Sequence, residues 1–130
     1  MKVFIFGSSG LVGHHCALAA HKRGFGVTAF YHRNPPQLPS GIRTLRLDLS
    51  NPEVAVRPLL DEFPDVVINA AALSSPDEVN AKPELAEKLN VQLPKRLAEV
   101  THHTGGRIIH LSTDMVFDGT SGPYRSSDKP

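Results

Sequence analysis

Short apolar runs alternate along this chain with longer segments in which apolar residues recur every three to four positions. The short runs predict buried β-strands, and the longer segments predict amphipathic helices. The expected strands are Lys2–Phe6, Gly26–Tyr31, Ile42–Leu47, Val66–Asn69 and Arg107–Ser112. The expected helices are Leu11–Arg23, a segment that starts at Pro52 and ends before Pro64, and Pro83–Thr104. Strands that alternate with helices favour a parallel sheet covered on both faces.

The helical segments carry apolar stripes that should face the sheet. The second stripe consists of Val56, Leu59, Leu60 and Phe63, and the third of Leu85, Leu89, Leu93, Leu97 and Val100. The stretch His32–Ser40 holds three prolines and is expected to be a loop, and no periodicity follows Asp118. The predicted fold class is therefore α/β, the N-terminal portion of a doubly wound parallel sheet of the Rossmann type, with about five strands.

Composition narrows the functional class. The 130 residues carry 14 Lys and Arg against 13 Asp and Glu, a formal net charge of +1. No basic cluster marks a nucleic-acid surface, and no apolar run approaches the ~20 residues of a membrane span. The single cysteine cannot form an internal disulfide, and the seven histidines lack the spacing of metal ligands. We expect a cytoplasmic domain that binds no metal, nucleic acid or membrane.

A glycine-rich segment, Gly7 to Gly13, joins the first strand to the first helix. Gly7 would permit a sharp turn, Gly10 would let the backbone approach a pyrophosphate, and Gly13 would let the helix pack closely. The free N–H groups of the helix N-terminus attract such an anion. A tight structural turn is the alternative. Because the pattern falls at the first β–α junction, the residues predicted to bind a dinucleotide here are Gly7, Ser9, Gly10, Leu11, Val12 and Gly13.

The residues after the second strand set the choice between NAD and NADP. An acidic residue there binds the ribose hydroxyls of NAD, whereas a basic residue accommodates the 2′-phosphate of NADP. This chain has Tyr31, His32 and Arg33, with no carboxylate nearby. The guanidinium of Arg33 could pair with the phosphate as a fork, although a solvated arginine is the alternative. The sequence favours NADP and leaves NAD open.

Further motifs follow the later strands. They are Leu47-Asp48-Leu49, Asn69-Ala70-Ala71-Ala72, Asn90-Val91 and Ser112-Thr113-Asp114-Met115-Val116-Phe117-Asp118-Gly119. Together with the glycine loop, these motifs resemble the extended short-chain dehydrogenase/reductase family. The last motif, and the tail from Gly122 to Pro130, are similar to its dTDP-4-dehydrorhamnose reductase branch. That branch also includes the regulatory beta subunit of methionine adenosyltransferase. The resemblance covers essentially the whole chain.

The resemblance implies cofactor contacts for the residues that match. Asp48 would hydrogen-bond the adenine amino group, with Leu49 beside the ring. Ala70, Ala71 and Ala72 would line the cofactor channel. A turn-capping acid is the alternative for Asp48, and close helix–sheet packing is the alternative for the alanines.

The resemblance also implies catalytic roles. Thr113 is similar to the hydroxyl that hydrogen-bonds the substrate carbonyl, and Asp114 would contact the substrate. The asparagine that matches Asn90 holds a water of the proton relay through its carbonyl. Pro94 has no N–H and would leave that carbonyl free, although a simple helix kink is the alternative.

One part of the family's machinery is absent from these residues. The proton donor is a tyrosine with a lysine four positions later, but Tyr31 is followed by Pro35 and Tyr124 by Asp128. Whether the chain is an enzyme is therefore left open. We expect residues 1–118 to form an NAD(P)-binding domain and residues 119–130 to lead to a further C-terminal part. The 130 residues alone should then bind NADP(H) weakly without turnover.

Two functions fit these observations. The first is the cofactor-binding part of an NADP-dependent reductase whose small-molecule substrate is a keto-sugar nucleotide. The second is a non-catalytic, nucleotide-binding regulatory subunit of the same family. A methyltransferase also has a glycine loop after its first strand, but Asp48, the alanine run and the Thr113 motif argue against that class. The exact substrate and the formation of a homo-oligomer stay open.

Overall fold

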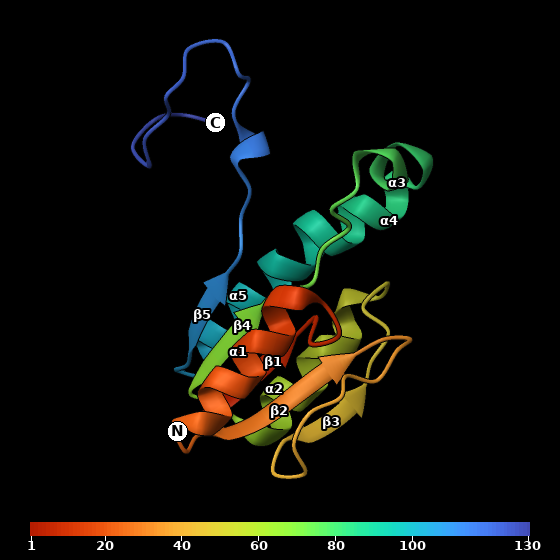
Figure 1. Ribbon diagram of the computed structural model, residues 1–130, viewed down its shortest axis with the longest axis vertical. Helices are drawn as coiled ribbons and strands as arrows, with labels where there is room; N and C mark the ends of the chain where they lie inside the picture. Colours follow the sequence, from red (N-terminus) through yellow and green to blue (C-terminus); the bar gives the residue numbers. More distant parts are fainter.

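The computed structural model describes residues 1–130. They form one parallel sheet with helices on both faces, followed by a C-terminal segment (Figure 1). The sheet has five strands in the order β3-β2-β1-β4-β5. The strands are β1 (Lys2–Phe6), β2 (Gly26–Tyr31), β3 (Arg43–Arg46), β4 (Val66–Asn69) and β5 (Arg107–His110). All five predicted strands and the α/β class are confirmed; β3 and β5 are shorter than the predicted Ile42–Leu47 and Arg107–Ser112.

The helices follow the predicted order with one addition. They are α1 (Leu11–Lys22), α2 (Val56–Glu62), α3 (Pro76–Ala81), α4 (Pro83–Glu87) and α5 (Leu93–His103), with single turns η1 (Pro52–Ala55), η2 (Lys88–Gln92) and η3 (Asp114–Val116). The 3-10 turn η1 precedes α2, and the Asn51 side chain caps it by accepting the Glu53 N–H at 3.1 Å. The short helix α3 was not predicted.

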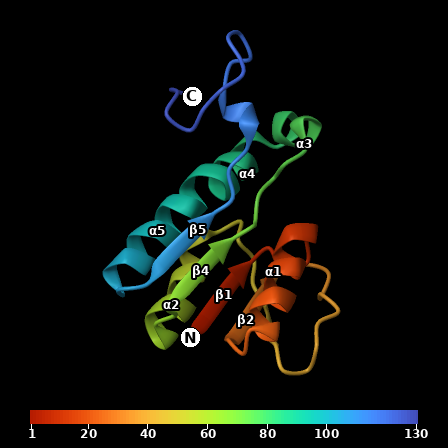
Figure 2. The ribbon, with the colours of Figure 1, turned by 60° about the vertical axis from the view of Figure 1, so that its left-hand side comes forward.

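The two faces of the sheet belong to two separate cores, because successive side chains of a strand point to opposite sides. Phe4 and Phe6 lie in the core that packs against α2 and α5. Val3 and Ile5 lie in the core that packs against α1. Figure 2 shows α1 on one side of the sheet and α2 and α5 on the other. The ring of Phe6 stacks on that of Phe30, with centroids 4.6 Å apart.

The predicted apolar stripe of the second helix is only half right. Val56 and Leu59 are buried, but Leu60 is 44% exposed and Phe63 is 61% exposed. The backbone of Phe63 ends α2 in the left-handed region, at φ +48. This conformation takes the residue off the helical path, so the periodicity that predicted its burial no longer applies at that point.

The predicted long helix from Pro83 is interrupted by the π-helical turn η2. Here the N–H of Leu93 donates to the carbonyl of Lys88, five residues earlier. The break has a local cause: Pro94 has no N–H for the carbonyl of Asn90, its expected partner four residues earlier. Such π turns occur frequently at functional sites.

The topology predicts where a ligand binds. From β1 the chain first adds β2 and β3 on one side and then β4 and β5 on the other. The order therefore reverses between β1 and β4, and open α/β sheets bind ligands outside the carboxyl ends of the strands at such a point. The segment after β5 runs away from the sheet beyond that edge (Figure 1). None of the helices combines the length and apolar character needed to cross a membrane.

Candidate functional site

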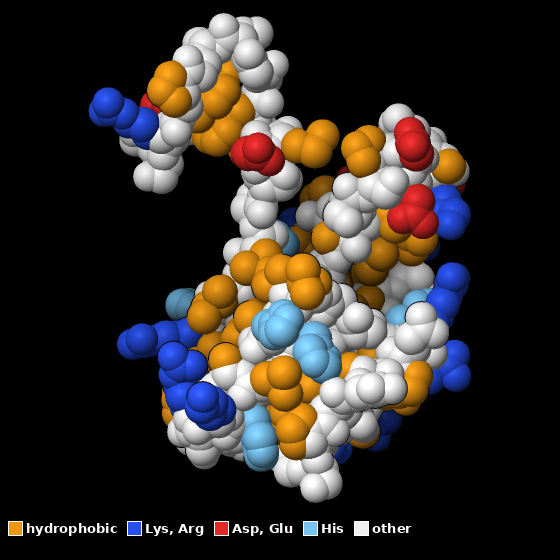
Figure 3. Space-filling view, in the orientation of Figure 1, with side chains coloured by type: hydrophobic (Ala, Val, Ile, Leu, Met, Phe, Trp, Pro, Cys, Tyr) orange, Lys and Arg blue, Asp and Glu red, His pale blue; other side chains and the backbone are white.

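A cavity of about 540 Å³ opens at the carboxyl ends of β1, β2 and β4, beneath α3 and α4. Figure 3 shows a hollow between the α3–α4 segment and the body of the domain. Its volume lies within the range of small-molecule sites. The predicted cofactor residues that line it are Gly7, Ser9, Gly10, Tyr31, His32, Arg33, Asp48, Leu49, Ala70, Ala71 and Ala72. The structure thus brings together motifs from four separate parts of the chain.

The glycine loop is shaped by backbone contacts that leave no room for side chains. Gly7 has φ +79, and a Cβ atom there would lie 2.6 Å from the backbone nitrogen of Ala71. A Cβ atom on Gly13 would lie 2.3 Å from the carbonyl oxygen of Gly7. Gly13 is therefore behind the loop rather than in the cavity, and it lets the first turn of α1 approach the turn after β1.

The glycine loop is open toward the cavity at Gly10, just before α1, and we call this opening the mouth of the loop. A Cβ atom on Gly10 would meet only the Gly7 carbonyl oxygen, at 3.4 Å. Gly10 is the N-cap of α1, and no side chain caps this helix. The N–H groups of its first turn have no carbonyl ahead of them in the helix. The side chains of Leu11 and Val12 are 78% and 49% exposed and do not line the cavity. Only their backbones could contact an anion here.

The far end of the cavity carries one carboxylate among basic residues. The Asp48 carboxylate accepts the Ser50 N–H at 3.0 Å and lies 3.6 Å from the His32 ring nitrogen Nε2. Hydrogen bonds from the Ser50 backbone and side chain lower the pKa of Asp48, and the charges of His32 and Arg33 add to this effect. Arg33 makes no ion pair in the structure.

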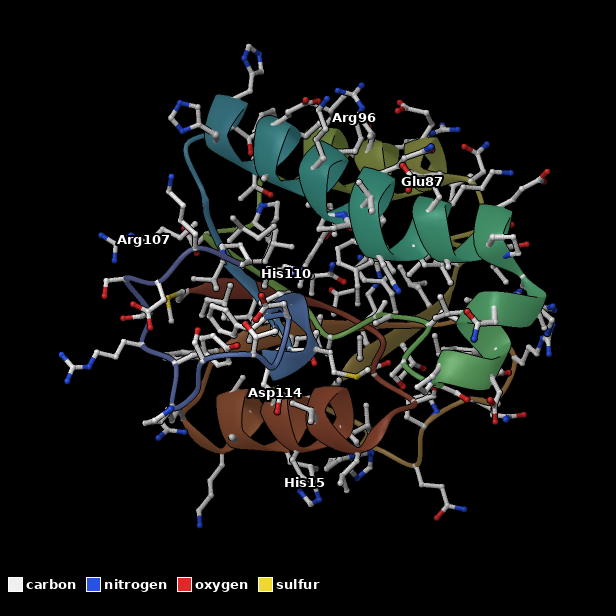
Figure 4. All side chains as sticks on the ribbon, turned by 90° about the horizontal axis from the view of Figure 1, so that it is seen from above. His15, Glu87, Arg96, Arg107, His110 and Asp114 are labelled. Carbon is white, nitrogen blue, oxygen red and sulfur yellow. The ribbon has the colours of Figure 1, made fainter.

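The buried asparagine that opens the alanine motif supports this segment, a role that was not predicted from the sequence. Asn69 is fully buried at the end of β4, and its Oδ1 accepts the Ala71 N–H at 3.1 Å. With Oδ1 occupied, Nδ2 points at Nδ1 of His110, 3.2 Å away. Figure 4 shows His110 between the layers of α5 and α1. If His110 is neutral, this contact makes Nδ1 the acceptor and leaves the proton on Nε2.

A second cavity of about 540 Å³ shares its wall with the first. Residues Ala70 to Leu73 line both, and Asn90, His110 and Thr113 line only the second. Asn90 and Thr113, for which catalytic roles were predicted, therefore line the same cavity. Asp114, in contrast, is not part of the lining.

The side chains of Asn90 and Thr113 are engaged in local structure. The Asn90 amide donates to the Leu73 carbonyl and accepts the Leu73 N–H, both at 2.9 Å. The Thr113 hydroxyl accepts the Met115 N–H at 3.2 Å and donates to Asp114 at 3.3 Å. Asn90 thus ties the middle of η2 to the segment that lines both cavities, a contact that its predicted carbonyl role did not include.

Several lining residues of the first cavity were missed from the sequence. They include Phe30, Asn34, Ser50, Leu73, Glu78, Lys82, Leu85 and Leu89. Leu85 and Leu89 were expected to belong to the core stripe; Leu89 does pack against the core and also lines the cavity. Glu78 lies in α3 and Lys82 directly follows it. This helix could have been predicted, because Ser75, Pro76 and two acidic residues form a typical helix start. No cluster of three His, Cys, Asp or Glu side chains could hold a metal ion.

Comparison with known proteins identifies relatives over the whole chain. The family model of the RmlD substrate binding domain matches residues 1–130. A probable low-salt glycan biosynthesis reductase of Haloferax volcanii, Agl14, is 36% identical over 132 residues, which cover 100% of this chain and 43% of the relative. The methionine adenosyltransferase 2 subunit beta of Xenopus laevis is 47% identical over 79 residues, 60% of this chain and 24% of the relative. The chain thus spans less than half the length of these relatives.

Solved structures agree with the sequence relatives. A hypothetical dTDP-4-dehydrorhamnose reductase of Sulfolobus tokodaii superimposes with a TM-score of 0.88 at 30% identity, covering 100% of this chain and 45% of that one. MoeE5 in complex with UDP-glucose and NAD gives a TM-score of 0.81 at 27% identity, covering 100% of this chain and 42% of that one. These matches agree with the resemblance on which the sequence-based expectations rest. The chain belongs to the RmlD substrate binding domain family.

Proposed function

We propose that this chain is the cofactor-binding part of an NADP-dependent reductase of a keto-sugar nucleotide. The observation that carries the proposal is the open, glycine-shaped mouth at the N-terminus of α1, which leads directly into the cavity at the strand ends. Backbone N–H groups at a helix N-terminus bind phosphate. The similarity to MoeE5, which was solved with UDP-glucose and NAD, supports a dinucleotide at this place.

The residues present fit a dinucleotide along the whole strand edge. Gly7 and Gly13 are required for the loop to close, and Gly10 leaves its mouth free of a side chain. The small side chains Ala70, Ala71 and Ala72 form a wall common to both cavities. We assign the first cavity to the adenosine half of the cofactor. The second, which contains Thr113, is assigned to the nicotinamide and the substrate.

NADP is the proposed cofactor because the first cavity offers a free guanidinium. Arg33 has no ion-pair partner, whereas Asp48 is held by His32 and Ser50. Because Asp48 already has these partners, it is poorly suited to hydrogen-bond the ribose hydroxyls of NAD as an acidic residue after β2 would. NAD is the alternative that the test must exclude.

The chemistry divides between the cofactor and this chain. The bound cofactor supplies the hydride for reduction of a carbonyl. In this proposal the Thr113 hydroxyl hydrogen-bonds the substrate carbonyl, and the carbonyl of Asn90 holds a water of the proton relay. Asp114, which does not line the cavity, accepts a hydrogen bond from the Thr113 hydroxyl instead of contacting the substrate. The Asn90 side chain positions Leu73 between the cavities. These 130 residues contain no Tyr-x-x-x-Lys pair to donate the proton.

An activity assay on the full-length protein tests the proposal. With a 4-keto sugar nucleotide such as dTDP-4-dehydrorhamnose, we expect oxidation of NADPH to accompany formation of the reduced sugar. A Thr113→Val variant, which retains the side-chain volume without the hydroxyl, should bind NADPH and lose turnover. Failure of the full-length protein to bind either NADPH or NADH would contradict the proposal.

A non-catalytic nucleotide-binding subunit is the second candidate. It is favoured by the 47% identity to the Xenopus laevis methionine adenosyltransferase 2 subunit beta. The same assay separates the two functions. Saturable NADPH binding by the full-length protein, without reduction of any keto-sugar nucleotide, would support the second function and reject the first.

A further inference from the structure

Two cationic side chains from different parts of the chain line the first cavity. Arg33 follows β2, while Lys82 is the residue between α3 and α4, and both line the cavity. Figure 3 shows Lys and Arg side chains along the right margin of the molecule, above and below the hollow. Lys82 therefore contributes a positive charge from the α3–α4 segment, and Arg33 contributes one from the segment after β2.

Neither cation is held in an ion pair within the protein, although the charge of Arg33 contributes to the lowered pKa of Asp48. The structure contains no ion pair that involves Arg33 or Lys82. The acidic residues that line the same cavity are Asp48 and Glu78. Asp48 is already engaged by His32 and by Ser50, and Glu78, one helical turn before Lys82, does not pair with it. Both cations are therefore available to an anionic ligand.

We infer that Lys82 and Arg33 together bind the 2′-phosphate of NADP, and that Lys82 is a determinant of cofactor specificity. The inference rests on the proposed function, because it concerns the same cofactor cavity. It adds a residue that lies outside every sequence motif described above.

The charge of the ligand favours a second cation beside Arg33. A phosphate monoester carries a charge of about −1.5 to −2 near neutral pH, which one arginine cannot balance. A guanidinium binds two phosphate oxygens as a planar fork, and a lysine ammonium adds a compact charge on a flexible stem. Asp48 and Glu78 would otherwise repel the phosphate. NAD has a neutral hydroxyl at this position, so Lys82 should not increase its binding affinity.

The test compares ligands that differ only in the 2′-phosphate. Calorimetry on the full-length protein would measure Kd for NADPH and NADH, and for adenosine 2′,5′-bisphosphate and adenosine 5′-monophosphate. Lys82→Met removes the charge and retains the stem. The matched control is Lys88→Met, since Lys88 lies on the same helical segment but lines a separate polar groove. Lys82→Arg tests whether a cation is sufficient.

We expect Lys82→Met to weaken binding of NADPH and of the bisphosphate about tenfold, as loss of one charge-assisted contact does. NADH and the monophosphate should change less than about twofold, Lys82→Arg should restore binding, and Lys88→Met should have no effect. Glu78→Gln should strengthen binding only of the two ligands that carry a 2′-phosphate, NADPH and adenosine 2′,5′-bisphosphate. If Lys82→Met changed the Kd equally for NADPH and NADH, or changed neither, the role of Lys82 would be overturned, but the proposed function would stand. Absence of binding to every nucleotide would overturn the proposed function as well.

Discussion

The side-chain amide of Asn90 holds the backbone of Leu73 through two hydrogen bonds, both 2.9 Å long. Leu73 belongs to the segment that lines both cavities, and Asn90 belongs to the π-helical turn before α5. One side chain thus links the irregular part of the long helix to the wall between the proposed cofactor and substrate regions.

Replacement of Asn90 by Ala should loosen this wall. It leaves the partly buried N–H and carbonyl of Leu73 without partners, which costs about 1–3 kcal/mol of unfolding free energy. Hydrogen exchange should show faster exchange at the Leu73 amide, and NADPH binding should weaken. Asn80→Ala is the control, because Asn80 lines the second cavity without a side-chain hydrogen bond in the structure. An unchanged exchange rate at the Leu73 amide in Asn90→Ala would show that this contact does not hold the wall.

Gly13 should be required for folding rather than for contact with the ligand. A Cβ atom at Gly13 would lie 2.3 Å from the Gly7 carbonyl oxygen, so Gly13→Ala must shift the loop or the helix. We expect a loss of about 1–3 kcal/mol in unfolding free energy, the usual cost of overpacking. Gly26→Ala is the matched control, because its nearest contact would be 4.0 Å away. Urea denaturation measures the unfolding free energy of both variants. Equal values would contradict the close approach of Gly13 to the Gly7 carbonyl.

Asp48 should make stability depend on pH on the acid side. Hydrogen bonds from Ser50 lower its folded-state pKa below the usual value near ~3.9. Its contribution is therefore complete above that value and is lost as pH falls through the lower, folded-state pKa. Because the side chain is 59% exposed, we expect less than about 1 kcal/mol. The difference in unfolding free energy between the unmodified protein and Asp48→Asn should shrink from pH 7 to pH 3, and a constant difference would contradict this assignment.

Thr113 should affect turnover more than binding. In the full-length protein, Thr113→Val should reduce kcat at least about a hundredfold, as loss of a positioned proton or hydrogen-bond donor does. Thr113→Ser should retain most activity because it keeps the hydroxyl. The hydroxyl also caps η3 by accepting the Met115 N–H, so the Kd for NADPH must be measured on each variant. Equal kcat for Thr113→Val and Thr113→Ser would remove Thr113 from the proposed chemistry.

The strands and the glycine loop could be predicted because their signals are local. An apolar run predicts a buried strand wherever it occurs, and glycines at a β–α junction report a turn that excludes Cβ atoms. The structure bears this out at Gly7 and Gly13. Asp48 and the alanine run were placed by family resemblance, and the sheet order brings them to the same edge.

The missed features depend on contacts between distant positions. Asn90 meets Leu73 across 17 positions, and Asn69 meets His110 across 41. Lys82 reaches the cavity only because the six-residue helix α3 folds back over the strand ends. Leu60 and Phe63 continue the apolar period, but Leu60 lies on an exposed side of α2, and the left-handed backbone at Phe63 takes that residue off the helix. No local pattern contains this information.

The most direct test of the central claim is a calorimetric titration of NADPH into the full-length protein and its Gly10→Ala variant. An alanine fits the fold at Gly10, with its nearest contact at 3.4 Å, but its methyl group stands in the mouth above α1. We predict saturable binding to the unmodified protein, competed by inorganic pyrophosphate, and at least about tenfold weaker binding to Gly10→Ala at unchanged Tm. No heat of binding at millimolar NADPH, or equal affinity of both proteins, would contradict the account.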